Sequence, residues 1–175
     1  AIIKDEGFSG KTEECYVLPT PGSAYRCIVL MGLGNFSSFD AEVLRRCAGQ
    51  VCTAVKSHKI DHLVLDASVA EALPVEAFIE GVILGSYDFI DYKAKPETPV
   101  TIVSEISVVV GSEEGLDELR EGCARTAIVC KNVNWARDLA NTPPNGLTPT
   151  KMGEYAEGIA QETGLICTLF DDAAL

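Results

Sequence analysis

Short apolar runs alternate with helical patterns along most of this 175-residue chain, and this alternation restricts its possible folds more than any other feature. The runs are rich in Val, Ile and Leu and are bounded by Gly, Pro or Ser, which predicts β-strands. The predicted strands are Cys15–Pro19, Arg26–Met31, His62–Ala67, Val100–Val110 and Leu165–Phe170. Strands that alternate with helices form βαβ units, so the sequence predicts an α/β protein with a parallel or mixed sheet.

Two segments between the predicted strands carry helix signals. In the first, Ser37 and Asp40 form a possible N-terminal cap, and apolar residues then recur at helical spacing. These residues are Leu44, Cys47, Val51 and Val55. In the second segment, Pro74 suits the first turn of a helix. The residues expected on one face of that helix are Phe78, Val82 and Ile83.

A longer helix is predicted after Gly111. Its acidic start at Glu113 and Glu114 suits the positive end of the helix dipole. The predicted apolar stripe of this helix consists of Leu116, Leu119, Cys123, Ala127, Cys130, Val133, Ala136 and Ala140. Small residues dominate the second half of the stripe, so we expect a neighbouring element to pack closely there.

Two adjacent prolines, Pro143 and Pro144, must end the long helix, because proline cannot donate to the helical ladder and disfavours helix in the residue before it. Thr148 is predicted to cap a new helix with Pro149 in its first position, and Gly164 to close it. The predicted parts are an α/β domain at 1–112, a connecting helix and Pro-rich joint at 113–146, and the first helix and strand of a second α/β domain at 147–175.

The charge balance of the chain argues against two classes of partner. It has 14 basic and 26 acidic residues, for a formal net charge of −12. Phosphate binding needs clustered Lys and Arg, so nucleic acid is disfavoured, and so is an anionic membrane surface. No apolar run is long enough to span a bilayer, and the N-terminus lacks the pattern of a signal peptide. We therefore predict neither a nucleic-acid partner nor a membrane.

Cysteine usage indicates a reducing compartment. The seven cysteines are Cys15, Cys27, Cys47, Cys52, Cys123, Cys130 and Cys167. Their number is odd and no pair has CxxC spacing, which favours neither a zinc ribbon nor a redox motif. Most lie in apolar patterns, where a free cysteine behaves as a small hydrophobic residue. We predict seven reduced thiols in an intracellular protein.

Gly32-Leu33-Gly34 follows a predicted strand and precedes a helix, where a phosphate-binding loop would lie. The dinucleotide fingerprint requires a third glycine, but Phe36-Ser37 stands at that place. A tight strand-to-helix turn is therefore the favoured interpretation, with a nucleotide site as the alternative.

The two histidines, His58 and His62, lie at the end of a helix and the start of a strand. Their spacing of four therefore does not place them on one helical face. Neither has a carboxylate at the spacing of a metal site or a triad, so ordinary surface histidines are predicted.

Two carboxylates near aromatic residues, Asp88 and Asp91, could form an acid–base pair, but their segment more closely matches a strand or loop that packs on the core. Arg137 and Asp138 are adjacent on a helix and cannot both address one substrate atom, whereas Arg137 and Asn141 share a face. We predict that these two hydrogen-bond the backbone of the Pro-rich joint. Residue chemistry alone thus predicts no catalytic, cofactor-binding or metal-binding residue.

The segment NWARDLANTPPNGLTPTKMGEYA, Asn134–Ala156, resembles the one that joins the two domains of the leucyl aminopeptidases of peptidase family M17. Members carry a similar ARDL-x-N-x-P-x-N run followed by TP and a helix. This sequence has Ala136-Arg137-Asp138-Leu139, Asn141, Pro143, Asn145 and Thr148-Pro149 in that order. Two further segments are similar to family segments, namely Gly81–Lys93 and Met31–Gly49.

The resemblance implies a macro-domain-like α/β fold, with a mixed sheet flanked by helices, for the N-terminal domain. It also implies a cytoplasmic homohexamer that releases N-terminal amino acids, often leucine, from peptides. Two divalent metal ions in the C-terminal domain, Zn or Mn with Mg or Co as alternatives, would lower the pKa of bound water and polarise the peptide carbonyl.

The metal ligands of the family are a lysine, three aspartates and a glutamate, in motifs such as a VG-x-GS segment and NTDAEGR. Neither motif occurs in this sequence, and Asp171–Leu175 matches only the approach to the first. We therefore assign no catalytic or metal residue and expect an N-terminal part of the enzyme that is inactive alone. Its expected partners are the remainder of the catalytic domain and further copies of itself. The alternatives are an autonomous macro-type domain that binds a nucleotide or ADP-ribose-like ligand, and a non-catalytic regulatory subunit.

Overall fold

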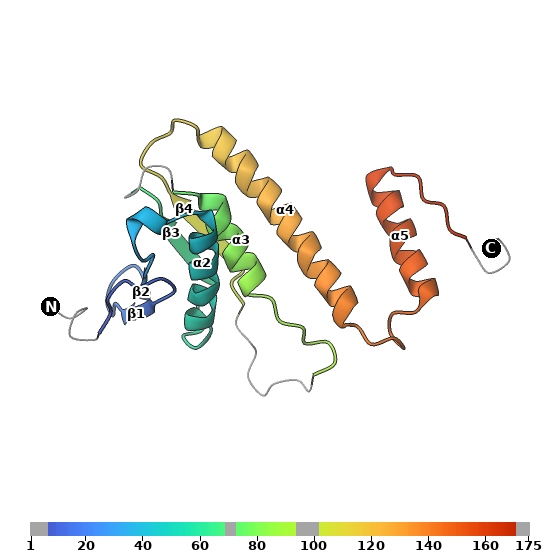
Figure 1. Ribbon diagram of the computed structural model, residues 1–175, viewed down its shortest axis with the longest axis horizontal. Helices are drawn as coiled ribbons and strands as arrows, with labels where there is room; N and C mark the ends of the chain where they lie inside the picture. Colours follow the sequence, from blue (N-terminus) through green and yellow to red (C-terminus); the bar gives the residue numbers. More distant parts are fainter. Residues whose placement is uncertain (1–6, 69–72, 94–101, 171–175) are drawn as a thin grey trace. The chain divides into compact units, whose positions relative to one another are not determined.

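The computed structural model describes residues 7–68, 73–93 and 102–170 (Figure 1). Val100 and Thr101 of the predicted fourth strand and Asp171–Leu175 lie outside the described residues. The chain divides into two compact units, Ala1–Asn134 and Trp135–Leu175, which are described separately below as unit 1 and unit 2. The predicted domain boundaries at 112 and 146 stay a prediction.

Unit 1 contains two small sheets, so the α/β prediction is confirmed for this part of the chain. The strands are β1 (Cys15–Pro19), β2 (Cys27–Met31), β3 (His62–Asp66) and β4 (Glu105–Val109). β1 and β2 pair antiparallel, with Cys15 opposite Met31. β3 and β4 pair parallel, with His62 opposite Glu105. Strand directions are therefore mixed, as predicted, but within the described residues the ladders form two sheets and no single one.

Helix α2 (Ala41–Lys56) begins where the sequence predicts and buries the predicted face. The Asp40 side chain caps it by accepting the Val43 N–H at 2.8 Å, while Ser37 belongs to a separate 3-10 turn, η1 (Phe36–Ser38). The buried residues of α2 include all the residues of the predicted stripe: Leu44, Cys47, Val51 and Val55. Burial of each of the leucine and valine side chains stabilises the fold by about 1.5–3 kcal/mol.

Helix α3 (Val75–Gly85) packs against α2 at very short range. A Cβ added at Gly85 would lie 2.8 Å from the Cα of Gly49, and one at Gly81 would collide with the carbonyl oxygen of Arg45. Side chains at these positions would force the helix backbones apart. Pro74, predicted in the first turn of this helix, directly precedes α3. Its carbonyl accepts the Ala77 N–H at 2.9 Å.

The core of unit 1 lies between these two helices and the strands. Its buried members are Leu44, Ala48, Val51, Cys52, Val55, Leu63, Phe78 and Val82. Ile83, expected on the same face of α3, is half-buried.

Helix α4 (Leu116–Asn141) is the predicted long helix, but its predicted stripe is partly wrong. Cys130 is buried, whereas Ala127, Val133, Ala136 and Ala140 are exposed. The inward side is instead the one that contacts α3. There the Asn134 side chain donates to the Ile83 carbonyl at 3.2 Å, and Gly122 lies against the Glu76 carboxylate. The contact with α3 determines which side of α4 is buried. The predicted stripe, drawn in steps of three and four residues, leaves that side in the second half of the helix.

Unit 2 contains the end of α4, the Pro-rich joint and helix α5 (Pro149–Thr163). α5 has the predicted caps: Thr148 Oγ1 accepts the Lys151 N–H at 3.2 Å, and Gly164 adopts the left-handed conformation with φ 74°. The joint is closed by the Gly146 N–H, which donates to the Pro143 carbonyl at 2.8 Å.

The predicted strand Leu165–Phe170 is wrong for the described structure, since these residues form no strand and all are exposed. A strand needs a neighbour to satisfy its backbone N–H and C=O groups. The described residues of unit 2 offer only helices and turns, so the propensity of this segment has nothing to pair with.

Candidate functional site

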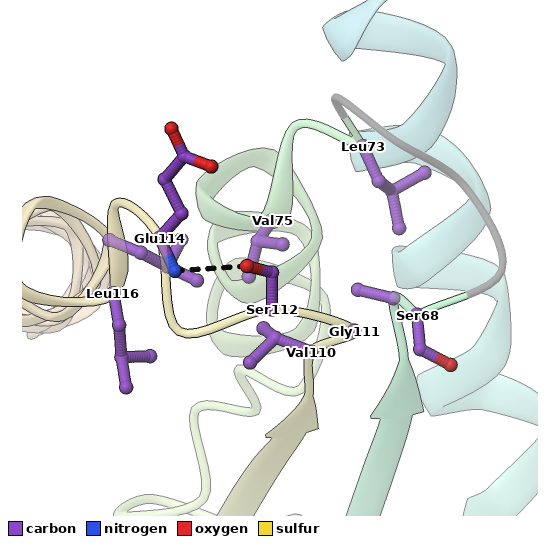
Figure 2. Close-up of a pocket in the computed structure, with 10 residues that line it drawn as sticks. Ser68, Leu73, Val75, Val110, Gly111, Ser112, Glu114 and Leu116 are labelled. Atoms are coloured by element: carbon purple, nitrogen blue, oxygen red, sulfur yellow. Dashed lines mark hydrogen bonds between the residues drawn. The ribbon is translucent and has the colours of Figure 1, made fainter.

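A pocket of about 530 Å³ lies in unit 1 at the carboxyl ends of β3 and β4 (Figure 2). Its lining residues are Ala67, Ser68, Leu73, Val75, Val110, Gly111, Ser112, Glu114, Leu116 and Leu119. They come from the segments that follow β3 and β4 and from the beginnings of α3 and α4. Ligands of open α/β proteins bind outside the carboxyl ends of the strands, so this is the candidate site that the topology favours.

The two serines that line the pocket both take part in local hydrogen bonds. Ser68 donates its N–H and its hydroxyl to Asp66 Oδ1, at 3.0 and 2.5 Å. The hydrogen bond from the Ser68 hydroxyl, with that from its N–H, lowers the pKa of the Asp66 carboxyl, which stays ionised. Ser112 Oγ accepts the Glu114 N–H at 3.1 Å (Figure 2).

The chemistry available in this pocket suits binding better than catalysis. Its walls are aliphatic, and its polar side chains are hydroxyls and one carboxylate, Glu114. Neither histidine is among the lining residues, so no imidazole stands beside Ser68 or Ser112 to act as a base. No motif in the sequence indicates this pocket, although Ser68 and Ser112 follow predicted strands, where ligands of α/β proteins bind.

The Gly32–Gly34 turn is held by backbone hydrogen bonds. The Gly32 N–H donates to the Glu14 carbonyl at 2.7 Å, and the Gly34 N–H donates to the Gly10 carbonyl at 3.0 Å. A phosphate-binding loop must offer free N–H groups, and these two are already used. The Gly32 carbonyl also accepts the Cys47 thiol at 3.3 Å, which ties the turn to α2. The structure therefore supports the interpretation as a tight turn.

The two histidines lie apart in different settings. His58 Nδ1 lies 3.0 Å from the Ala54 carbonyl oxygen at the end of α2. His62 Nε2 lies 2.9 Å from Ser107 Oγ and 3.6 Å from Glu105 Oε1 on the exposed face of the β3–β4 pair. Both partners approach the same ring nitrogen, whereas a triad places the carboxylate on the other one. The sequence did not indicate that His62 lies beside Ser107 and Glu105, because this proximity depends on the register of β3 against β4.

Asp88 is paired with a cation and not with Asp91. Lys93 Nζ donates to Asp88 Oδ1 at 2.8 Å, and this hydrogen bond lowers the pKa of the Asp88 carboxyl. A carboxyl held ionised in this way is poorly suited to act as a general acid. The Phe89 and Tyr92 rings stack nearby, with centroids 5.8 Å apart, and the segment forms a loop; that it packs on the core stays a prediction.

In unit 2, the end of α4 is closed by Thr142. Its hydroxyl donates to the Asp138 carbonyl at 2.7 Å, and its N–H donates to the same oxygen at 2.9 Å. These bonds satisfy a carbonyl that the helix itself leaves without a partner. That Arg137 and Asn141 bind the backbone of the joint stays a prediction.

Across the residues that the structure describes, no group of three or more His, Cys, Asp or Glu side chains could hold a metal ion. The described residues therefore do not fit a dinuclear metal centre. All seven cysteines are free thiols, and burial raises the pKa of the Cys52 thiol to about 11. Within the same described ranges, no helix is both long and apolar enough to cross a membrane.

The family assignment comes from comparison with known sequences. The sequence model described as "Cytosol aminopeptidase family, N-terminal domain" matches residues 1–96, more than half of the chain. The chain belongs to the cytosol aminopeptidase family. This confirms the resemblance to the M17 leucyl aminopeptidases that the joint segment indicated.

Individual relatives agree with this assignment. A "Probable cytosol aminopeptidase" from Roseiflexus castenholzii is 33% identical over 182 residues, which cover 99% of this chain and 37% of the relative. A solved tomato leucine aminopeptidase mutant is similar with a TM-score of 0.72 and 25% identity, over 91% of this chain and 32% of that one. The structure titled "Bottromycin maturation enzyme BotP in complex with Mn" shares the fold, with a TM-score of 0.75 and 24% identity over 94% of this chain and 34% of that one. The chain thus spans about a third of the length of these proteins.

Proposed function

We propose that this chain is the N-terminal part of a cytoplasmic metallo-aminopeptidase that releases N-terminal amino acids, leucine by preference, from peptides. In this proposal the segment supports the catalytic domain and the assembly of a homohexamer, and it takes no part in the chemistry. The observation that carries the proposal is the match of residues 1–96 to the N-terminal domain of the family, in a chain that spans 37% of a relative named as an aminopeptidase.

The proposed cofactor is a pair of divalent metal ions, Zn or Mn with Mg or Co as alternatives, bound by the part of the polypeptide that follows. Metal ions would supply a Lewis acid and an activated water. The Mn in the solved BotP complex supports a divalent ion in a protein of this fold. Since the described residues here offer no ligand cluster, none of them is assigned to the metals.

The packing of unit 2 supports a role as the beginning of a larger domain. α5 is 15 residues long, and none of its residues is buried. Its side chains contact the end of α4 through an edge-on pair of rings, Trp135 and Tyr155, with centroids 5.8 Å apart. An amphipathic helix gains most of its stability from burying its apolar face, so a helix like α5 is marginal without further partners.

The proposal is tested by comparing the 175-residue chain with the full-length protein. We expect the 175-residue chain to show no metal-dependent hydrolysis of leucine amide in Zn, Mn, Co or Mg, and the full-length protein to hydrolyse it. Turnover by the shorter chain, freed of contaminating enzyme, would refute the non-catalytic role. A full-length protein that stays inactive with every metal would refute the aminopeptidase assignment.

A binding module for a nucleotide or ADP-ribose-like ligand remains the second candidate, because a pocket does lie at the strand ends. The family match favours the first proposal, and so do the occupied N–H groups of the Gly32–Gly34 turn. The ionised Asp66 carboxyl and Glu114 also disfavour a phosphate near Ser68 and Ser112. Calorimetry with ADP-ribose separates the two, since a micromolar dissociation constant would favour the binding module.

A further inference from the structure

The outer side of α4 in unit 1 carries three large aliphatic residues that no other described part of unit 1 covers. Ile128, Val129 and Val133, which we call the α4 patch, are 64%, 55% and 40% exposed. The opposite side of the helix holds Cys130, which is 1% exposed, and Asn134, which donates to α3. The α4 patch is therefore turned away from the core of unit 1.

Exposure of this kind is unusual on the solvent face of a helix, where charged and polar residues are expected. α4 follows that rule in its first turns, which carry Asp117, Glu118, Arg120 and Glu121. The large exposed aliphatic residues of α4 in unit 1 are those of the α4 patch. Neighbouring exposed aliphatic residues mark a surface that another polypeptide covers.

The surroundings of the α4 patch are basic in a strongly acidic chain. Arg125 and Lys131 flank it and are exposed, and no acidic residue occurs between Glu121 and Asp138. No ion pair found among the described residues includes Arg125 or Lys131. A partner surface with an apolar centre and carboxylates at its edge would complement this arrangement.

We infer that the α4 patch is the docking surface for the part of the polypeptide that members of this family carry beyond the region matched here. The inference rests on the proposed function. The relatives have about two thirds of their length outside the match, so in those proteins the same polypeptide includes a partner large enough to cover such a patch. A second copy docked through the same patch would bring Arg125 and Lys131 of the two copies together, and like charges at an interface oppose docking.

The test uses acylation of Lys131, read by mass spectrometry relative to Lys59, an exposed lysine of unit 1 that follows α2. We expect the Lys131 rate to be about tenfold lower in the full-length protein than in the 175-residue chain, because docking covers its surroundings. The double variant Val129→Asp with Val133→Asp should return the full-length rate to that of the short chain. Ala124→Asp, at an exposed α4 position outside the patch, is the matched control and should not.

Equal Lys131 rates in the full-length protein and the 175-residue chain would overturn the inference. So would protection that appears only as subunits associate with rising protein concentration, since a second copy would then be the occupant. Protection already present in the 175-residue chain, relative to the same chain in denaturant, would show that the chain covers the patch itself.

This test is independent of the activity assay. A full-length protein with a protected α4 patch and no aminopeptidase activity would refute the proposed function and leave the docking surface standing. An active full-length protein in which Lys131 is not protected would leave the proposed function standing and refute the docking surface.

Discussion

The two units of this chain differ in whether they bury a core. In unit 1, Leu44, Ala48 and Val55 have no exposed surface at all. In unit 2, the large apolar side chains of α5 are exposed: Met152 by 50%, Tyr155 by 36% and Ile159 by 40%. Helix formation alone therefore does not make a domain, because both α2 and α5 are well-capped helices of similar length.

The difference lies in the partners that each helix meets. α2 packs on α3 and on strands β1 and β2, and these neighbours cover its apolar face. Within the described part of unit 2, α5 contacts the end of α4 through Tyr155 and Trp135, and Leu169 of the following segment lies against Gly153. Unit 1 thus buries an apolar core, whereas no residue of α5 in unit 2 is buried.

The largest expected effect comes from deleting a core side chain in each unit. Leu44→Ala should lower the free energy of unfolding of unit 1 by about 2–5 kcal/mol, through lost burial and the cavity left behind. Ile159→Ala in α5 should cost about 0.5 kcal/mol or less, because the side chain is already exposed. Denaturant unfolding of the 175-residue chain measures both, with circular dichroism for the whole chain and fluorescence of Trp135 for unit 2.

Similar losses for Leu44→Ala and Ile159→Ala would contradict the comparison, since they would mean that α5 has a core of its own. Coincident transitions by circular dichroism and fluorescence would likewise show that the units unfold as one.

The same substitution should have opposite signs in the two units. Gly81→Ala places a Cβ against Arg45 and Ala48 in the α2–α3 contact, and such overpacking should destabilise unit 1 by about 1–3 kcal/mol. Gly158→Ala in α5 meets no atom within 4 Å, so it should stabilise the helix by up to about 1 kcal/mol through helix propensity. Unfolding midpoints and helicity at 222 nm give the two signs. A stabilising Gly81→Ala would mean that the close approach of α2 and α3 is not maintained in solution.

Thiol reactivity should distinguish the two units without any mutation, although the effect is confined to individual cysteines. Burial raises the pKa of Cys52 in unit 1 to about 11, while Cys167 in unit 2 is exposed. At pH 8 a thiol reagent should modify Cys52 at least about a hundredfold more slowly than Cys167, because the thiolate is the reactive form. Raising the pH should increase the Cys52 rate until the pH passes its pKa.

Thiol counting under denaturing, non-reducing conditions should return all seven cysteines. A lower count would reveal a native disulfide and contradict the predicted reducing compartment. Equal native rates for Cys52 and Cys167 would show that the core of unit 1 opens readily.

Much of the candidate site could not be read from the sequence, and the reason is the separation of its parts. The pocket brings Ser68 and Ser112 together from segments 44 residues apart along the chain. The contact of His62 with Ser107 likewise requires the register that sets His62 opposite Glu105. The Asp88–Lys93 pair is local, and it forms in a loop, whereas the sequence left both a strand and a loop open for this segment.

The sequence by itself determined the features that depend on near neighbours. Asp40 and Thr148 cap their helices, the two prolines end α4, and four short apolar runs become strands, because each effect involves groups within a few residues of one another. Only the tertiary structure decided which side of α4 is buried, how β3 is registered against β4, and that Leu165–Phe170 forms no strand here. Each of these depends on the presence of a distant partner, and the free energy of burial and strand pairing exists only where that partner is supplied.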